Sequence, residues 1–348
     1  MYETSVQHTN PQATNPPAGG AKAAPPVAFH TAGGVTARGL GKQFGDLWAL
    51  RGLHLDVAPG QVLGLLGHNG AGKTTAIRIL TTLSRPSEGS AMVAGFDVVS
   101  AGEDVRRRIG VAAQQATVDG LLSARLNLEM VGRLHGLSKA EARRRGDELL
   151  ERLDLTDDGN KLVKAFSGGM RRRLDLAASL VAEPDVLFLD EPTTGLDPRS
   201  RGDLWLMLRD LVRNGTTLVL TTQYLEEADR LADDIVVLDH GRTVAHGTPE
   251  ELKREIGDQR VDVKLASVGE LVPAASAIAP FVGGEPTLDE EALVVTAAMR
   301  DGVRLVDIVR ALDEAGIDAV DLNRREATLD DVFLTLTSAS HSPQEAMS

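Results

Sequence analysis

The chain has 348 residues, of which 42% are hydrophobic, so it is long enough to bury the cores of two globular domains. Its formal net charge of −13 at pH 7 argues against a general nucleic-acid-binding protein, and the absence of cysteine excludes disulfide bonds and thiolate chemistry. No apolar run approaches the roughly 18 residues of a membrane-spanning helix, and nothing resembles a signal peptide. We therefore expect any membrane role to come through a partner chain.

The first segment has no pattern typical of a folded element. Residues 1–34 are rich in Pro, Ala, Gly, Thr and Asn and show no periodic apolar spacing. Such a segment buries too little apolar surface to offset the entropy of ordering it. We predict that it is a disordered tail.

A β-rich segment follows. Residues 35–38 and 53–57 read as strands, and the turn residues around them predict an antiparallel piece that lies against the core of the domain. Phe44 lies in the connection between these strands, just upstream of a glycine-rich loop. An aromatic ring at this place could stack on a base, although a lone Phe more often belongs to a core.

Residues 67–75 fit the phosphate-binding pattern GxxxxGK[ST]. An apolar strand predicted at 62–66 leads into this loop and a helix predicted at 73–83 leads out, which disfavours a glycine-rich turn that binds nothing. The glycines let backbone N–H groups close around a polyphosphate, while the lysine reaches the β- and γ-phosphates and the next hydroxyl holds Mg²⁺. We assign nucleotide binding to Gly67, His68, Asn69, Gly70, Ala71, Gly72, Lys73, Thr74 and Thr75.

The segment from about 106 to 180 is predicted to be a helical subdomain, because its apolar residues follow helical spacing. Three arginine runs in this segment are interpreted as solvated helix faces. Phe166 is followed by Ser167, Gly168 and Gly169 at the start of a helix, where a hydroxyl and free amides form a second anion-binding end. By itself Ser-Gly-Gly is also a common flexible loop. The predicted helices are 126–134, 139–153 and 169–180, and the arginine runs are 106–108, 143–145 and 171–173.

An apolar strand at 186–190 ends in two carboxylates, Asp190 and Glu191. A strand end beside a phosphate loop is where an acid that holds Mg²⁺ belongs, and a second acid could polarise the attacking water. The alternative, a solvated turn, is disfavoured by the phosphate loop upstream. Another apolar strand, at 219–222, ends before Gln223, and this predicts that the Gln223 amide lies beside the phosphates.

The pattern changes again after Glu255, and we predict a small α/β domain over residues 256–348 with a frayed end. The role of this domain is left open, because a dimer brace, a partner contact and a regulatory site all fit. The expected strands are 260–266 and 292–298, and the expected helices are 304–315 and 329–336.

Taken together, residues 35–255 resemble the ATP-binding subunit of an ABC transporter. This resemblance implies an α/β fold, namely a P-loop NTPase domain of the ABC type with an antiparallel β subdomain and a helical subdomain. The loop at 67–75 matches the Walker A motif, the Phe-Ser-Gly-Gly run is similar to the LSGG signature, and the strand ending in Asp190 and Glu191 matches Walker B. Gln114 matches the Q-loop, Asp197 matches the D-loop, and Phe44 falls where the family has its adenine-stacking aromatic residue.

A closer likeness is to the daunorubicin/doxorubicin-resistance branch of exporters, in which a separate ATPase subunit drives a separate membrane subunit. Residues 220–229 and 327–334 look like that branch. The chain departs from the wider family at two positions. Gln223 stands where most ABC proteins have the switch histidine, and Phe166 replaces the usual Leu of the signature.

The resemblance also implies a head-to-tail homodimer that holds ATP and Mg²⁺ between Walker A of one subunit and the signature of the other. Thr74, Gln114 and Asp190 are then expected to hold Mg²⁺, and Glu191 is expected to be the general base. Ser167 and Gly169 would contact the partner's γ-phosphate. We also hypothesise that Gln223 hydrogen-bonds the γ-phosphate or the attacking water.

The expected function is ATP hydrolysis that drives efflux of a hydrophobic drug or antibiotic through a separate membrane permease. The subunit would then lie at the cytoplasmic side of the cell membrane, and no nucleic-acid partner is expected. The alternative is a soluble ABC-type ATPase acting on ribosomes or DNA. Such proteins usually carry two cassettes or a long coiled-coil insertion, whereas this chain has one Walker A motif and no sustained heptads.

Overall fold

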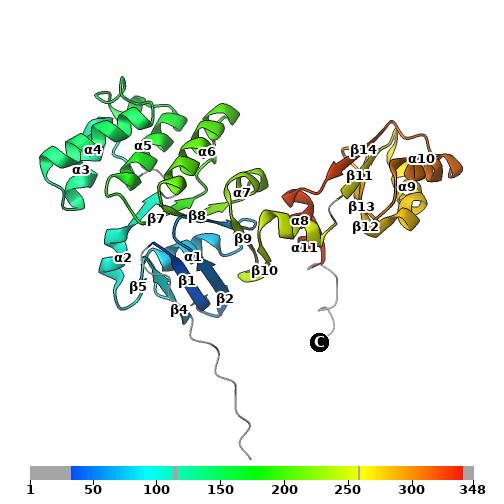
Figure 1. Ribbon diagram of the computed structural model, residues 1–348, viewed down its shortest axis with the longest axis horizontal. Coiled ribbons are helices and arrows are strands. Elements are labelled where there is room, and N and C mark those ends of the chain that lie inside the picture. Colours follow the sequence, from blue (N-terminus) through cyan, green and yellow to red (C-terminus); the bar gives the residue numbers. More distant parts are fainter. Residues whose placement is uncertain (1–32, 113–116, 258, 340–348) are drawn as a thin grey trace, which may run out of the picture.

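The computed structural model describes residues 33–112, 117–257 and 259–339, and within these ranges the strands form three sheets. The predicted tail, apart from its last two residues, and Gln114 of the predicted Q-loop lie outside the described residues. Figure 1 shows a larger body on one side and a smaller α/β domain on the other. None of the described helices is long and apolar enough to cross a membrane.

The central sheet of the larger body is parallel except at one edge, where β10 pairs antiparallel with β9. Every residue of its two middle strands is buried, because a parallel strand covered on both faces is apolar along its whole length. The strand order is β10 (Arg242–Gly247), β9 (Asp234–Asp239), β3 (Val62–Leu66), β8 (Thr217–Thr222), β7 (Val186–Asp190) and β6 (Ile109–Ala112).

Two hydrophobic clusters cover the faces of this sheet. Side chains such as Phe188 and Val219 pack toward α1 (Lys73–Leu80) and the antiparallel sheet. Leu187 and Leu220, one residue along each strand, point to the other face and pack with α5 (Gly168–Leu180) and α6 (Pro198–Arg213). The antiparallel sheet has the order β2 (Leu47–Val57), β1 (Val35–Phe44), β4 (Glu88–Val93) and β5 (Phe96–Asp97).

The helical region begins later than the sequence predicted. The prediction started it at about residue 106, but Ile109 and Ala112 belong to β6, an edge strand of the central sheet. Residues 109–112 were misassigned because a strand of four residues is too short to show a characteristic spacing of apolar residues. The helices are α2 (Gly102–Arg108), α3 (Ala124–Leu134), α4 (Lys139–Arg152), α5 (Gly168–Leu180), α6 (Pro198–Arg213), α7 (Leu225–Leu231) and α8 (Pro249–Glu255), with a 3₁₀ turn at Val163–Ala165.

The smaller domain is an antiparallel sheet covered by α9 and α10. The sequence predicted its two middle strands and α10 but missed α9 and both edge strands. Edge strands need only one paired side and tolerate polar residues, Gly and Pro, so β12 and β14 lack an apolar pattern. The elements are β11 (Gln259–Lys264), α9 (Leu271–Ile278), β12 (Val282–Asp289), β13 (Val294–Met299), α10 (Leu305–Glu314) and β14 (Asp321–Glu326), with 3₁₀ turns at Val268–Glu270 and Ala279–Phe281.

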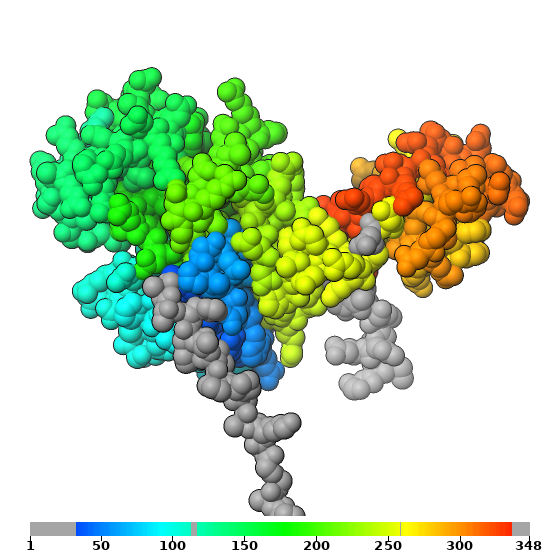
Figure 2. Space-filling view, viewed as in Figure 1, coloured from blue at the N-terminus to red at the C-terminus, as the bar shows by residue number. Residues whose placement is uncertain are grey.

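The last helix, α11 (Leu329–Ala339), packs against the larger body, although the sequence predicted that it belongs to the small domain. Leu329 and Val332 are each 2% exposed and join a cluster that includes Leu66 and Leu252 of the larger body. Figures 1 and 2 show the small domain standing apart and connected to the body where α8 and α11 lie. The segment after residue 255 therefore returns to complete the core of the larger body.

An ion-pair network attaches the other side of α11 to the small domain. Both Nη atoms of Arg325 on β14 donate to the Asp331 carboxylate, at 2.6 and 3.0 Å, and Arg325 Nε donates to Asp262 at 2.7 Å. Burial would raise the pKa of Asp331, but Arg325 and the N–H and hydroxyl of Thr328 outweigh it and lower the pKa to about 2. Asp331 is thus the polar anchor of the helix.

We expect Asp331→Asn to lower the free energy of unfolding at neutral pH by about 2 kcal/mol or more. Because the folded-state pKa lies below the ordinary value, the carboxylate contributes fully above about pH 5. That contribution is lost as the pH falls toward 2, the pKa in the folded chain. Urea unfolding at pH 7 and about pH 3 measures both effects. Asp330→Asn, an exposed neighbour on the same helix, is the control, and equal unfolding of the two variants would contradict the anchor.

Candidate functional site

The loop after β3 adopts the conformation that its glycines permit. Gly67, Gly70 and Gly72 have φ angles of 155°, 88° and 108°, which side-chain-bearing residues rarely adopt. A Cβ on Gly67 would lie 2.4 Å from the carbonyl oxygen of Leu238 on β9. Gly72 caps α1 without a side-chain hydrogen bond, so the first N–H groups of the helix remain directed at the loop. The geometry suits a polyphosphate.

Lys73 begins α1 and turns back into this loop. Its Nζ donates to the carbonyl oxygens of Gly67 and His68, at 2.6 and 3.1 Å, and lies 3.9 Å from Oε1 of Glu191. Burial lowers the pKa of Lys73, while the negative charges of Glu191 and Asp190 act to raise it. The amine is therefore held at the loop by carbonyls and faces two carboxylates.

Asp190 at the end of β7 lies beside the first turn of α1. Its Oδ2 accepts from the Thr74 hydroxyl at 3.3 Å, and its Oδ1 accepts from the Thr221 hydroxyl on β8. The carboxylate is 8% exposed, so these contacts and the nearby Lys73 compensate most of its lost hydration. Two oxygen donors, the carboxylate and the Thr74 hydroxyl, thus lie next to the loop.

Glu191 is turned toward the same place by an uncommon backbone conformation. Its φ is +49°, in the left-handed region that costs a side-chain-bearing residue energy unless the surroundings stabilise it. The Glu191 N–H donates to both the carbonyl and the hydroxyl oxygen of Thr221, each at 3.1 Å, and this holds the turn. The sharp turn aims the side chain back at Lys73 instead of along the strand direction.

Gln223 follows directly after β8, which lies between β3 and β7 in the sheet. Its side chain is exposed, whereas the two threonines before it are fully buried. The structure thus places residue 223 at the sheet edge that carries the loop and both carboxylates.

Sequence reasoning missed Arg172, which it assigned to a solvated helix face. That assignment is wrong, because the Arg172 side chain is 11% exposed and points from α5 to the end of β7. Its Nε donates to the Pro192 carbonyl at 2.8 Å, and its Nη2 donates to the carbonyls of Asp190 and Glu191 at 3.0 and 3.1 Å. Arg172 stands between two other arginines, so nothing in the sequence separates it from them. Only the packing of α5 shows that its side chain is turned inward.

Glu227 on α7 is a second group that the sequence did not reveal. Its side chain is fully buried and accepts from Trp205 Nε1 on α6 at 3.2 Å. Burial raises the pKa of Glu227, while hydrogen bonds from Thr222, Trp205 and Thr193 act to lower it. This carboxyl thus links α7 to α6 through the Trp205 indole.

The remaining predicted residues that the structure describes lie at the starts of helices or at the surface. Ser167 caps α5 by accepting from Met170 N at 3.2 Å, and it and Gly168 are exposed while Gly169 is half-buried. Asp197 caps α6, because its carboxylate accepts from the N–H groups of Arg199 and Ser200. Phe44 is 56% exposed at the end of β1, and Gln114 falls outside the described residues.

Comparison with known proteins agrees with this geometry. A family model described as ABC transporter matches residues 50–194. The chain is 54% identical to the daunorubicin resistance ATP-binding protein DrrA3 of Streptomyces coeruleorubidus over 90% of this chain and 98% of that protein. It is 45% identical to the doxorubicin resistance ATP-binding protein DrrA of Mycobacterium tuberculosis, strain H37Rv, over 87% and 93%.

The fold is also similar to a solved structure. The ATP-binding cassette MJ0796, solved as a dimer in a post-hydrolysis state with ADP and Pi, superposes with a TM-score of 0.57 at 26% identity, over 62% of this chain and 98% of that one.

The fold and the site define an ATP-binding, ATP-hydrolysing subunit of the ABC type. Within this class, the chain belongs to the family of daunorubicin/doxorubicin-resistance ATP-binding proteins. The sequence analysis was correct about this membership, the α/β fold and the ATPase activity.

Proposed function

We propose that this chain hydrolyses ATP as one half of a homodimer and thereby drives efflux of a hydrophobic drug or antibiotic through a separate membrane permease. The observation that carries this proposal is the convergence of Lys73, Thr74, Asp190 and Glu191 at one edge of the central sheet. These residues supply a cation, a hydroxyl and two carboxylates around a phosphate-binding loop. The relatives are named for resistance to daunorubicin and doxorubicin, and this supports drugs of that class as the exported substrate.

Mg²⁺ fits the donors that the structure brings together. The Thr74 hydroxyl and the Asp190 carboxylate lie 3.3 Å apart, and both are hard oxygen ligands of the kind that Mg²⁺ prefers. The Thr221 hydroxyl holds the other carboxylate oxygen and so fixes the orientation of Asp190. Bound Mg²⁺ would neutralise charge on the β- and γ-phosphates, and Gln114 is proposed as a further ligand.

Glu191 is proposed as the general base. Its side chain lies 3.9 Å from Lys73 Nζ and accepts from the Thr194 hydroxyl at 3.4 Å, so it faces the place where the phosphates bind. A carboxylate there takes the proton from the attacking water. Gln223, at the neighbouring strand end, donates or accepts a hydrogen bond without changing its charge between about pH 5 and pH 8, and so positions the γ-phosphate or the water.

The homodimer is proposed to be head-to-tail. The phosphate-binding loop at 67–75 (the P-loop) supplies hydrogen-bond donors on one side of a triphosphate. The negative charge on the other side therefore needs a second set of donors. Ser167, Gly168 and Gly169 at the start of α5 provide such a set, since the first N–H groups of a helix attract anions and Ser167 and Gly168 are exposed. Asp197 would lie at the same interface, and Phe44 would stack on the adenine.

The permease is proposed to bind the helical region, which places the subunit at the cytoplasmic side of the membrane. One face of α3 exposes three apolar side chains, Leu126, Met130 and Leu134, which are 50%, 40% and 79% exposed. They recur every four residues and so form a stripe along the helix. An apolar stripe of this kind on a water-exposed helix is typical of a protein–protein contact.

Two substitutions separate nucleotide binding from chemistry. Lys73→Ala should abolish hydrolysis and weaken ATP binding, because it removes the buried cation of the loop. Glu191→Gln should keep ATP affinity but slow hydrolysis by at least about 100-fold, because an amide is a poor base. Phosphate release and binding of a fluorescent ATP analogue measure the two effects. A Glu191→Gln variant that turned over at the wild-type rate would remove Glu191 from the role of base.

Gln223→Ala should slow turnover by roughly 10- to 1,000-fold, the usual cost of a lost transition-state hydrogen bond, with little effect on ATP affinity. Gln223→His should retain activity and add a pH dependence near neutrality. Both are measured as steady-state ATP hydrolysis with the permease present. Wild-type turnover in Gln223→Ala would place this residue outside the chemistry.

Met130→Asp should abolish co-purification with the permease while leaving ATP binding intact, because a carboxylate cannot be buried in an apolar contact without a partner. Leu206→Asp on α6 is the matched control, since Leu206 is also an apolar helix residue and is 67% exposed. Affinity purification from membranes that contain the permease measures both. Equal recovery of the permease with the two variants would refute docking through α3.

A further inference from the structure

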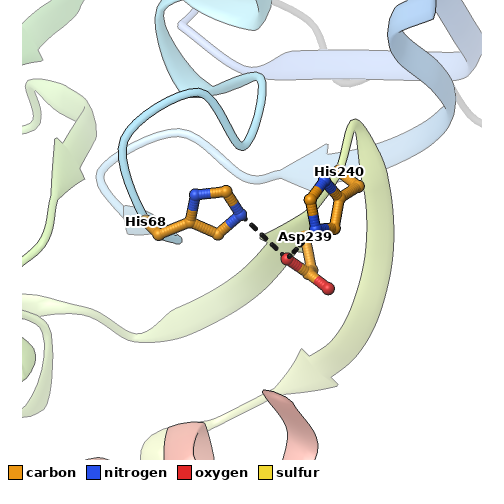
Figure 3. Close-up of side chains that lie close together, drawn as sticks. All are labelled: His68, Asp239 and His240. Carbon is orange, nitrogen blue, oxygen red and sulfur yellow. Dashed lines mark hydrogen bonds and ion pairs between the residues drawn. The ribbon is translucent and has the colours of Figure 1, made fainter. Parts of the chain in front are cut away.

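Three metal-ligating side chains meet where the P-loop approaches the turn between β9 and β10 (Figure 3). His68 Nε2 lies 2.9 Å from Asp239 Oδ1, and His240 Nε2 lies 3.8 Å from the same oxygen. The ligand atoms of the three residues all lie within 4.8 Å of one another. The nucleotide-binding role assigned above to His68 uses its backbone N–H, and no role proposed above uses its imidazole, Asp239 or His240.

The central sheet produces this meeting. β9 runs parallel to β3, and Leu66 pairs with Val237, so the end of β9 lies beside the start of the P-loop. The Gly241 N–H donates to the Ala71 carbonyl at 3.0 Å, which joins the turn to the loop through the backbone. Asp239 is therefore at a rigid position, buried at 7% exposure, between one imidazole from each segment.

The second ring nitrogen of His68 supports a metal site. Nδ1 lies 2.7 Å from the carbonyl oxygen of Asn69, and a carbonyl accepts only from a protonated nitrogen. Nε2, the other ring nitrogen, faces Asp239 Oδ1 and is the atom that would bind an ion. A histidine that ligates a metal usually donates its other N–H to a carbonyl or carboxylate, and the His68–Asn69 contact reproduces that arrangement.

The separations fit a transition metal. Bonds of about 2.0–2.2 Å from a tetrahedral ion to nitrogen and oxygen place neighbouring ligand atoms about 3.3–3.6 Å apart. The observed separations of 2.9 and 3.8 Å lie on either side of that range. His68 and His240 are 38% and 75% exposed at the side chain, so the site is open to solvent and can admit an ion.

We propose that His68, Asp239 and His240 bind a transition-metal dication such as Zn²⁺, and that the ion ties the P-loop to the β9–β10 turn. Two imidazoles and one carboxylate suit Zn²⁺, Co²⁺ or Ni²⁺, whereas Mg²⁺ prefers oxygen ligands alone. This site is thus chemically distinct from the Thr74–Asp190 pair.

The site is tested by titrating the full chain with Co²⁺ and Zn²⁺, without nucleotide and with Mg²⁺ in excess. Co²⁺ should give the visible absorption of a low-coordinate nitrogen and oxygen site. His240→Asn should weaken Zn²⁺ binding by roughly 10- to 100-fold or more. Asn suits the backbone at this position, because His240 has a φ of +45° and Asn tolerates the left-handed region.

His246→Asn is the matched control. His246 also pairs with a carboxylate, Asp234 at 2.7 Å, on the same two strands, but the described residues offer no third ligand there. This variant should bind Zn²⁺ as the wild type does. Equal Zn²⁺ affinity in His240→Asn and His246→Asn would overturn the site.

The tie to the P-loop has its own readout. Hydrogen exchange of the amides in residues 67–72 should slow when Zn²⁺ is added to the wild type and to His246→Asn, and should not change in His240→Asn at the same Zn²⁺ concentration. Zn²⁺ binding to the wild type without any change in the exchange of this loop would refute the tie.

Discussion

The parallel register of β3, β8 and β7 is the constraint on which the site depends. Leu66 pairs with Thr222, and Thr221 pairs with Asp190, so all three strands end at the same level. In a parallel sheet the strand ends come to one edge, and residues that follow those ends meet there although they are far apart along the chain. The phosphate loop, the two carboxylates and Gln223 are brought together in this way. Their positions therefore depend on the buried apolar strands and on the helices that cover both faces.

The electrostatics of this edge are balanced within the chain. Lys73 is buried, and its positive charge faces Asp190 and Glu191, which lowers the cost of taking all three groups out of water. Arg172 adds a further restraint, because it holds the backbone of both carboxylates from α5. Ser167 caps the N-terminus of that same helix. The end of the helix proposed to contact the partner's nucleotide is therefore linked by direct contact to the proposed general base.

The C-terminal segment contributes to the ATPase body as well as to a domain of its own. α11 places Leu329 and Val332 in the cluster beneath β3 and β9, and places Asp331 in the arginine network of the small domain. Because the apolar side of α11 packs in the larger body and its Asp331 pairs with the small domain, this helix joins the two parts of the chain. Removal of residues 256–348 would expose the apolar surface around Leu66 and Leu252, so the small domain cannot be regarded as a simple appendage.

The sequence alone determined the nucleotide chemistry, the α/β class and the family, because these depend on short motifs whose residues are adjacent in the chain. A glycine-rich loop between an apolar strand and a helix can be recognised from adjacent residues alone, and so can two acids after an apolar strand. The tertiary structure decided what arises from contacts between distant segments. Arg172 and its neighbours are the same residue type, and only packing shows which of them holds the carboxylate backbone. The edge strands β12 and β14 are polar, the helix α11 has an apolar face that fits either domain, and His68, Asp239 and His240 meet only after the sheet has formed, so no local pattern could have revealed them.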